Sequence, residues 1–266
     1  MENIETKAKP PKRAIWSGSI SIGLVNVPVK LYPMIYDKSF SFRMLHKSDG
    51  YPLRYTKVCS REGEEVEKND IIKGYEVKRG EFVMITDDEL KTLAPETDKR
   101  IRLDKFVPFL SIDPIYLEKS YILTPNKSPE AYNLLLMTLR NLGMAGVGKF
   151  TLRSKEAPIL LHEYKGALLL TTLRYSYEVV DPQDMEEINN LKEPSEKELE
   201  LAIRIIENLS GELDITEYRD TYSERVKELI EMKSKGEVIF IEEPKKEEVK
   251  DLMAALQMTL KELEEK

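Results

Sequence analysis

The fold follows from one stretch of the sequence, Arg13-Ala-Ile-Trp-Ser-Gly-Ser-Ile-Ser-Ile-Gly-Leu-Val-Asn-Val-Pro-Val-Lys-Leu-Tyr32. Apolar residues alternate with small or polar ones, first at Ile20, Ile22 and Leu24, then at Val25, Val27, Val29 and Leu31. This period of two, rich in β-branched residues, predicts half-buried strands. The parity changes beside Gly23, which predicts a bulge or a bend at a barrel corner. Pro28 cannot donate to a sheet, so we expect its segment at an edge or a bulge.

The next 150 residues predict more strands and two helices. Strands are expected at 39–44, at 74–86 as a hairpin or a bulged strand, and at 100–109, 116–123, 146–155, 158–163 and 167–173, with 175–180 extending the last. Thr86-Asp-Asp-Glu89 is a capping box for a helix through Leu93. Ser128 and Pro129 begin a helix to about Leu142, whose apolar residues wrap widely enough to predict a mostly buried helix. The sequence therefore predicts an α+β domain with an antiparallel β-barrel core.

Residues 43–72 predict an exposed arm. They are poor in aliphatic side chains and carry two polar turn signals, Lys47-Ser-Asp-Gly50 and Arg61-Glu-Gly-Glu-Glu65. Such a segment has too little apolar surface to bury itself in a core.

Prolines and capping residues divide the C-terminal third. Asp181-Pro182 and Glu193-Pro194 bracket a linker, and Ser195-Glu-Lys-Glu198 is a second capping box. The following helix has a stripe of Leu199, Ala202, Ile203 and Ile206, and the next has Tyr218, Tyr222, Val226 and Leu229. After Pro244, apolar residues at 249, 252, 253, 256, 260 and 263 predict a terminal amphipathic helix. We divide the chain into a disordered N-terminus (1–12), a barrel and arm (13–181), a helical arm (182–243) and this terminal helix (244–266).

Charge is distributed unevenly along the chain. The net formal charge of −7 argues against nucleic acid at first sight, but residues 1–57 hold ten Lys and Arg against four Asp and Glu. Residues 181–266 hold thirteen against twenty-five. A folded chain with this asymmetry can present a basic surface on one side and repel DNA on the other.

The sequence patterns that suggest an enzyme or a metal site each lack a required residue or context. Gly143-Met-Ala-Gly-Val-Gly-Lys149 fits a phosphate-loop pattern, but Phe150 replaces the metal-binding Ser or Thr, and a helix precedes where a strand is required. Cys59 is the single cysteine and has no thiol partner. His162 alternates within an apolar strand and is interpreted as a hydrogen-bonded sheet histidine. No acidic set has the spacing of a calcium loop.

Basic residues on strands and turns remain. Lys149, Arg153 and Lys155 share parity with Thr151, so they project from one face of the expected strand. Three cations and a Thr suit a track for phosphates, and a solubilising outer face stays open as the alternative. More cations lie in the arm, at Arg43, Lys47, Arg54 and Lys57.

Several blocks of residues follow residues 13–32 along the chain: Lys73-Gly-Tyr-Glu76, Asp113-Pro-Ile-Tyr-Leu-Glu-Lys-Ser-Tyr121, Thr172-Leu-Arg-Tyr175, Glu217-Tyr-Arg-Asp-Thr-Tyr-Ser-Glu-Arg225 and Asp251-Leu-Met-Ala-Ala-Leu256. Together and in this order, the blocks resemble the prokaryotic Ku family, the homodimeric DNA-end-binding proteins of non-homologous end joining. The resemblance spans residues 13–266. It implies that the arm bridges over DNA, that the C-terminal helices form a dimerisation arm, and that two subunits close a ring. Many bacterial relatives place cysteine pairs in the arm, and a single Cys59 cannot rebuild such a zinc site.

The resulting prediction is sequence-independent binding of double-stranded DNA ends by a ring-shaped homodimer that recruits and stimulates a ligase of the ligase D type. The candidate DNA-binding residues are Lys30, Arg43, Lys47, Arg54, Lys57, Lys149, Arg153 and Lys155. The candidate dimer interface is Tyr218, Tyr222, Val226 and Leu229, and the candidate ligase-binding residues are Leu252, Met253, Leu256 and Leu260.

No catalytic residue, metal or cofactor is expected, and the protein is expected in the cytoplasm with the nucleoid, away from membranes. Two alternatives stay open on the residues alone. One is a non-enzymatic β-barrel module for protein–protein contact without DNA-end specificity. The other is a hydrolase that uses Cys59 or a pair of carboxylates.

Overall fold

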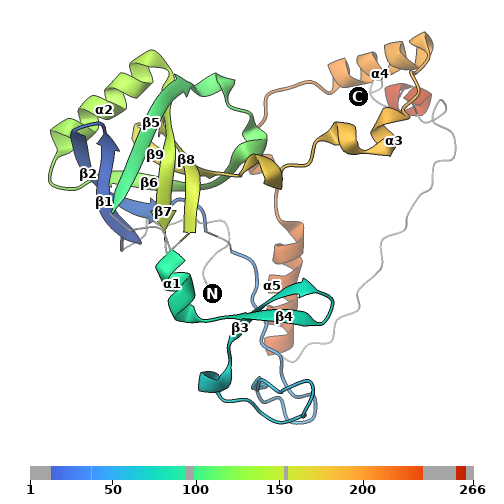
Figure 1. Ribbon diagram of the computed structural model, residues 1–266. Coiled ribbons are helices and arrows are strands. Elements are labelled where there is room, and N and C mark those ends of the chain that lie inside the picture. Colours follow the sequence, from blue (N-terminus) through green and yellow to red (C-terminus); the bar gives the residue numbers. More distant parts are fainter. Residues whose placement is uncertain (1–12, 37, 94–98, 153–154, 236–255, 262–266) are drawn as a thin grey trace. The chain divides into compact units, whose positions relative to one another are not determined.

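The computed structural model describes residues 13–36, 38–93, 99–152, 155–235 and 256–261 (Figure 1). The chain divides into two compact units, residues 1–180 and 181–266. The expected boundary after residue 181 lies beside this division. Val238–Ile241, for which the sequence suggests a short strand, lies outside the described residues.

A closed seven-stranded barrel forms the core of the first unit (Figure 1). Its strands are β1 Trp16–Ile22, β2 Val25–Pro33, β5 Arg100–Pro108, β6 Leu117–Pro125, β7 Met144–Leu152, β8 Lys155–Tyr164 and β9 Ala167–Leu173. They pair in the order β1-β2-β6-β9-β8-β7-β5, and all neighbours are antiparallel except β1 and β5, which run parallel and close the barrel. The predicted barrel is confirmed, with this one parallel contact added.

The change of parity in the opening stretch comes from a tight turn, so the expected bulge or bend is wrong. Ile22 pairs with Val25 across a two-residue connection in which Gly23 has φ +57°. Positive φ favours Gly, and a Gly-X pair is typical of two-residue hairpins. Leu24 is therefore fully exposed at the tip, while Ile20 and Val29 face the barrel interior.

Pro28 lies on an interior strand, because β2 pairs with β1 on one side and β6 on the other. The ladder between β2 and β6 begins only at Val29 opposite Pro125. Beyond it, the carbonyl of Pro28 accepts the N–H of Asn126 at 3.0 Å. The missing N–H of Pro28 therefore falls at the end of a ladder, where it breaks no sheet hydrogen bond.

Helix α2, Pro129–Leu142, covers one end of the barrel (Figure 1). Tyr132 fixes it there: its hydroxyl donates to the carbonyl of Leu123 and accepts the N–H of Leu168, both at 2.8 Å. The helix begins after Ser128 and ends at Gly143 with φ +62°, as the sequence predicts. Its burial was overestimated, because Leu134 is 71% exposed.

A second buried layer lies on the outside of the barrel wall, where Leu160 and His162 have the opposite parity to the inward-facing Ile159 of β8. The ring of Phe109, in the segment between β5 and β6, covers His162 at a centroid distance of 4.9 Å. His162 Nε2 lies 3.2 Å from Thr171 Oγ1, and Nδ1 lies 3.2 Å from the carbonyl of Glu163. The prediction of a hydrogen-bonded sheet histidine is confirmed.

Burial should make the stability of the barrel depend on pH through His162. Desolvation lowers the pKa of His162 below its ordinary value of about 6.5. The neutral form is favoured in the folded state, so its contribution is complete above the unfolded pKa of about 6.5 and is lost as the pH falls below it through the lower folded-state pKa. Denaturant unfolding between pH 8 and 5 should show a flatter dependence for His162→Gln than for the wild type; equal slopes would exclude this role.

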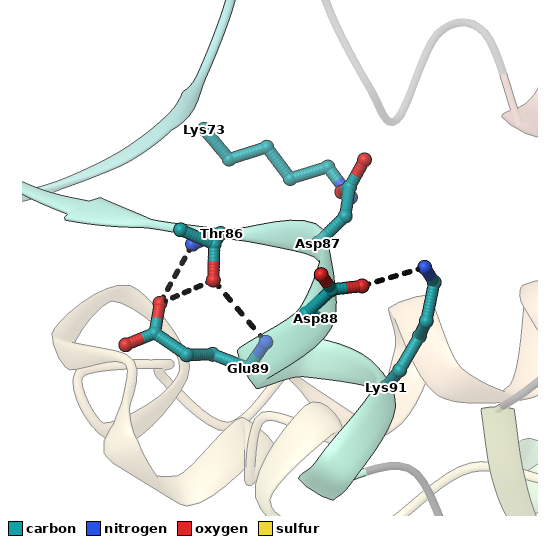
Figure 2. A network of polar contacts seen from close by, with 6 residues as sticks. All are labelled: Lys73, Thr86, Asp87, Asp88, Glu89 and Lys91. Atoms are coloured by element: carbon teal, nitrogen blue, oxygen red, sulfur yellow. Dashed lines mark hydrogen bonds and ion pairs between the residues drawn. The ribbon is translucent and has the colours of Figure 1, made fainter.

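Turns, single bridges and a short 3-10 helix form the arm, and a two-stranded ribbon and a helix follow it. Strands β3 Lys73–Lys78 and β4 Glu81–Ile85 form a two-stranded hairpin, and α1 Asp87–Leu93 follows. Figure 2 shows the predicted capping box, in which Thr86 Oγ1 accepts the N–H of Glu89 and the Glu89 carboxylate accepts the N–H of Thr86. An ion pair between Lys73 and Asp87, 2.9 Å, joins the base of the hairpin to the helix and lowers the pKa of Asp87.

Two of the strands predicted from the sequence do not form. Residues 39–44 form no strand, and the nearest pairing is a single bridge between Leu45 and Pro52. Residues 175–180 do not extend β9, because Ser176–Glu178 is a 3-10 turn.

The second unit contains α3 Glu186–Asn189, α4 Glu196–Asn208 and α5 Thr221–Ser234. The Ser195 capping box of α4 is confirmed: Ser195 Oγ accepts the N–H of Glu198, and the Glu198 carboxylate accepts the N–H of Ser195. Residues 256–261 are helical, which agrees with part of the predicted terminal helix.

Candidate nucleic-acid interface

A row of cations crosses the outer wall of the barrel. Strand pairing places Lys30 opposite Ser17, Arg100 opposite Ser19, Arg102 opposite Ser21, and Lys149 opposite Arg102. These residues have the opposite parity to the buried Ile20 and Ile101, so their side chains point away from the core. We call Lys30, Arg100, Arg102 and Lys149 the outer row.

Short hydroxyl side chains lie between the cations of the outer row, so no bulky side chain projects between them. Ser17 and Ser19 alternate along β1, and Thr124 of β6 lies opposite Lys30. Ser21 is buried, and its hydroxyl donates to Asn26 Oδ1 at 2.7 Å. Guanidinium, ammonium and hydroxyl groups are donors suited to phosphate oxygens. Their arrangement on a rigid wall can contact a sugar–phosphate backbone without inserting into a groove.

Lys149 is engaged within the wall. Its Nζ lies 3.2 Å from the carboxylate of Glu156, which is on the neighbouring strand β8. The lysine is two-thirds exposed, so this ion pair is screened by water and its contribution to stability is small. The ammonium can therefore exchange the carboxylate for a phosphate at modest cost.

Lys155 does not share a face with Lys149, so this prediction is wrong. The expected strand at 146–155 is two strands of a hairpin, in which Leu152 pairs with Lys155 and Thr151 pairs with Glu156. Cross-strand partners lie on the same face, so Lys155 has the parity of the inward residues and lies at the rim of the barrel. Arg153 lies outside the described residues.

The arm cations are all exposed, at Arg43, Lys47, Arg54 and Lys57. Within the described part of the chain, none of the four forms an ion pair. Two turns of matching geometry carry the arm: Gly50 N–H donates to His46 O and Gly63 N–H donates to Cys59 O, each at 2.8 Å with the Gly at φ +72°. These turns hold the chain in a defined shape without a core.

Comparison with known proteins identifies relatives of this chain. The family model for the Ku70/Ku80 beta-barrel domain matches residues 21–201. The chain is 39% identical over 249 residues to the non-homologous end joining protein Ku of Archaeoglobus fulgidus, covering 93% of this chain and 98% of that protein. The chain belongs to the Ku family.

Two bacterial Ku proteins extend the comparison. The Bacillus subtilis protein is 35% identical and matches 96% of this chain and 84% of its own length. The Mycobacterium tuberculosis protein is also 35% identical, over 94% of this chain and 95% of its own length. The family resemblance inferred from the sequence blocks is confirmed, and so is the Ku-type barrel followed by a helical region.

Arg100 and Arg102 are not among the candidate DNA-binding residues predicted from the sequence. Both lie in a correctly predicted strand, but their parity marks them only as outward-facing. Their relation to Lys149 depends on β5 pairing with both β1 and β7, which are distant in sequence. The alternation of Arg100, Ile101, Arg102 and Leu103 was the available signal.

The candidate dimer residues are not all on one helix. Tyr218 precedes α5, which begins at Thr221, so the expected stripe starts too early. Tyr222 and Tyr218 are exposed, Leu229 is half-buried, and Val226 is only 8% exposed. Leu256 and Leu260, two of the candidate ligase-binding residues, are half-buried in the short helical stretch, and Leu252 and Met253 lie outside the described residues.

No group of three or more His, Cys, Asp and Glu side chains among the described residues is arranged to hold a metal ion. Gly143-Met-Ala-Gly-Val-Gly-Lys149 runs from the end of a helix into a strand, which confirms the order that excluded a phosphate loop. No helix of the described part is both long and apolar enough to span a bilayer.

Proposed function

We propose that this protein binds the ends of double-stranded DNA without reading their sequence, as a ring-shaped homodimer acting in non-homologous end joining. The similarity to end-joining Ku proteins over nearly the whole chain carries this proposal. The outer row supports it, because its four cations and the hydroxyls between them are donors suited to phosphate oxygens. A ring holds an end by enclosing it, which suits breaks of arbitrary sequence.

A comparison of linear and covalently closed duplexes of equal length tests the proposal. The linear duplex should compete far better, and blocking both of its ends with hairpins bulkier than a ring should remove the advantage. If about six phosphates are neutralised, log K should fall against log salt with a slope of roughly −5. Equal affinity for the two duplexes would reject end binding and favour a general interaction module.

The homodimer part of the proposal rests on apolar surface in the second unit. Leu199, Ile203 and Ile206 recur along one side of α4, and all three are exposed in the single chain. A stripe of this kind at helical spacing is typical of a helix that packs on another surface. Sedimentation should give a dimer at micromolar concentration, and a stable folded monomer would refute the dimer.

The terminal segment is proposed to recruit a ligase of the ligase D type. Its apolar positions are spaced for one helical face, and its flanking Glu and Asp residues would repel phosphate. Deleting residues 245–266 should leave end binding and dimerisation intact while abolishing stimulation of ligation. Packing of this helix on its own chain is the alternative, and it predicts instead that the truncated protein loses stability.

A further inference from the structure

A polar hollow of about 180 Å³ lies at the rim of the barrel, where β8 begins and β9 ends. Two cations, Lys155 and Arg174, line it together with Tyr175, Glu118 and Glu178. The proposed ring does not use these residues together. Their chemistry also differs from that of the outer row, because this group includes aromatic rings.

Two tyrosines form a stacked pair beside the hollow. The rings of Tyr175 and Tyr177 have a centroid distance of 5.2 Å and an interplanar angle of 10°. Tyr175 is anchored, since its hydroxyl donates to the carbonyl of Glu156 at 3.3 Å and its N–H donates to the Glu178 carboxylate at 2.7 Å. Tyr177 is 80% exposed, so it presents one open face on a fixed support.

The cations are held in different ways. The Arg174 guanidinium donates from Nη1 to the carbonyls of Ile115 and Leu117, which fixes its plane at the wall. Lys155 is exposed and forms no ion pair within the described residues. A flexible ammonium at the rim can follow a phosphate, while the guanidinium stays beside the hollow.

The carboxylates decide what the hollow accepts. Glu118 and Glu178 would repel a phosphate placed inside it, so the phosphates of a bound nucleotide stay outside the hollow. The open face of Tyr177 can stack on a nucleobase, and Lys155 at the rim can contact its phosphate. In a duplex the base faces are already stacked, so only an unpaired nucleotide can use this site.

Glu156 connects this site to the outer row. Its carboxylate contacts Lys149 of the row, and its carbonyl accepts the hydroxyl of Tyr175. Glu156 of β8 is therefore in contact with both the outer row and the tyrosine pair.

We propose that the open ring face of Tyr177 binds an unpaired nucleotide of a DNA overhang, by stacking and without regard to its identity. The proposal rests on the proposed end binding and adds a preference for ends that carry a single-stranded extension. Unpaired bases at a break would then be held apart from the enclosed duplex.

Affinity for matched duplexes with blunt ends, 5′ overhangs and 3′ overhangs tests the site. The wild type should bind one overhang type more tightly than the blunt duplex, and Tyr177→Ala should lower that affinity about tenfold while leaving blunt-end affinity unchanged. Tyr177→Phe should retain the preference, because it keeps the ring. An overhang of abasic nucleotides should behave like the blunt end.

Tyr164→Ala is the matched control, since Tyr164 is an exposed tyrosine of β8 with Lys165 5.3 Å from its ring centre and, among the described residues, no ring stacked on it. The affinity of the same variants for a single-stranded oligonucleotide is also measured. This tests stacking on Tyr177 even if linear and closed duplexes bind equally. Equal binding of blunt and overhang ends by the wild type, an unchanged preference in Tyr177→Ala, or a preference retained by the abasic overhang would overturn the inference.

Discussion

Replacing Arg100 and Arg102 together with alanine should weaken binding to linear duplex about a hundredfold at moderate salt. Each guanidinium that contacts a phosphate contributes about 1.5 kcal/mol through a charge-assisted hydrogen bond, which is about a tenfold change in Kd. The loss should be the same for any DNA sequence, because phosphates carry no sequence information. The slope of log K against log salt should become shallower by about two units, one for each cation.

The control removes equal charge elsewhere. Arg204 and Arg219 belong to the acidic second unit, and their double alanine variant changes net charge by the same amount. It should bind DNA almost as the wild type does. A similar loss in both double variants would mean that total charge matters more than the outer row, and wild-type binding by Arg100→Ala/Arg102→Ala would remove the row from the interface.

Local signals in the sequence predicted the elements that depend on neighbours along the chain. The capping boxes at Thr86 and Ser195, and the Gly143 stop, each involve residues within a few positions of one another. The hydrogen bonds that define them form inside one turn, so the residue types alone specify them.

The errors have equally local causes. β7 ends at Leu152 and β8 begins at Lys155, and the sequence from 152 to 155 has no Gly, Asn or Asp that would predict a reversal there. The single strand predicted there carried Lys155 onto the wrong face. At Gly23 the signal was present, but a change of parity fits both a bulge and a two-residue turn.

The outer row could not be predicted because it is assembled across the sheet. Arg102 and Lys149 are neighbours only because β5 leaves the arm and pairs with β1 in parallel and with β7 on its other side. Pairing between distant strands is set by how the whole barrel closes, and the alternation within one strand reports only which side chains face outward. The family resemblance predicted a DNA-binding surface without locating these arginines.

The largest effect on stability is expected from a substitution where β5 pairs with β7, at Gly148. Gly148 of β7 faces inward where β5 crosses it, and a Cβ at this position would lie 1.8 Å from the carbonyl oxygen of Arg102 and 2.8 Å from the Cα of Leu103. Both obstacles are backbone atoms, so no side chain can move aside. Gly148→Ala should therefore force the two strands apart and lower the free energy of unfolding by more than about 3 kcal/mol.

Gly211→Ala is the control, because a Cβ there meets no atom within 4 Å. Its unfolding midpoint should stay near that of the wild type, while Gly148→Ala should unfold at much lower denaturant or fail to accumulate as a folded protein. A Gly148→Ala variant that still folds should lose DNA affinity as well, since separating β5 from β7 moves Arg102 away from Lys149. An unchanged midpoint would show that the strands can relax, and the tight approach of β5 and β7 would then not be what aligns the outer row.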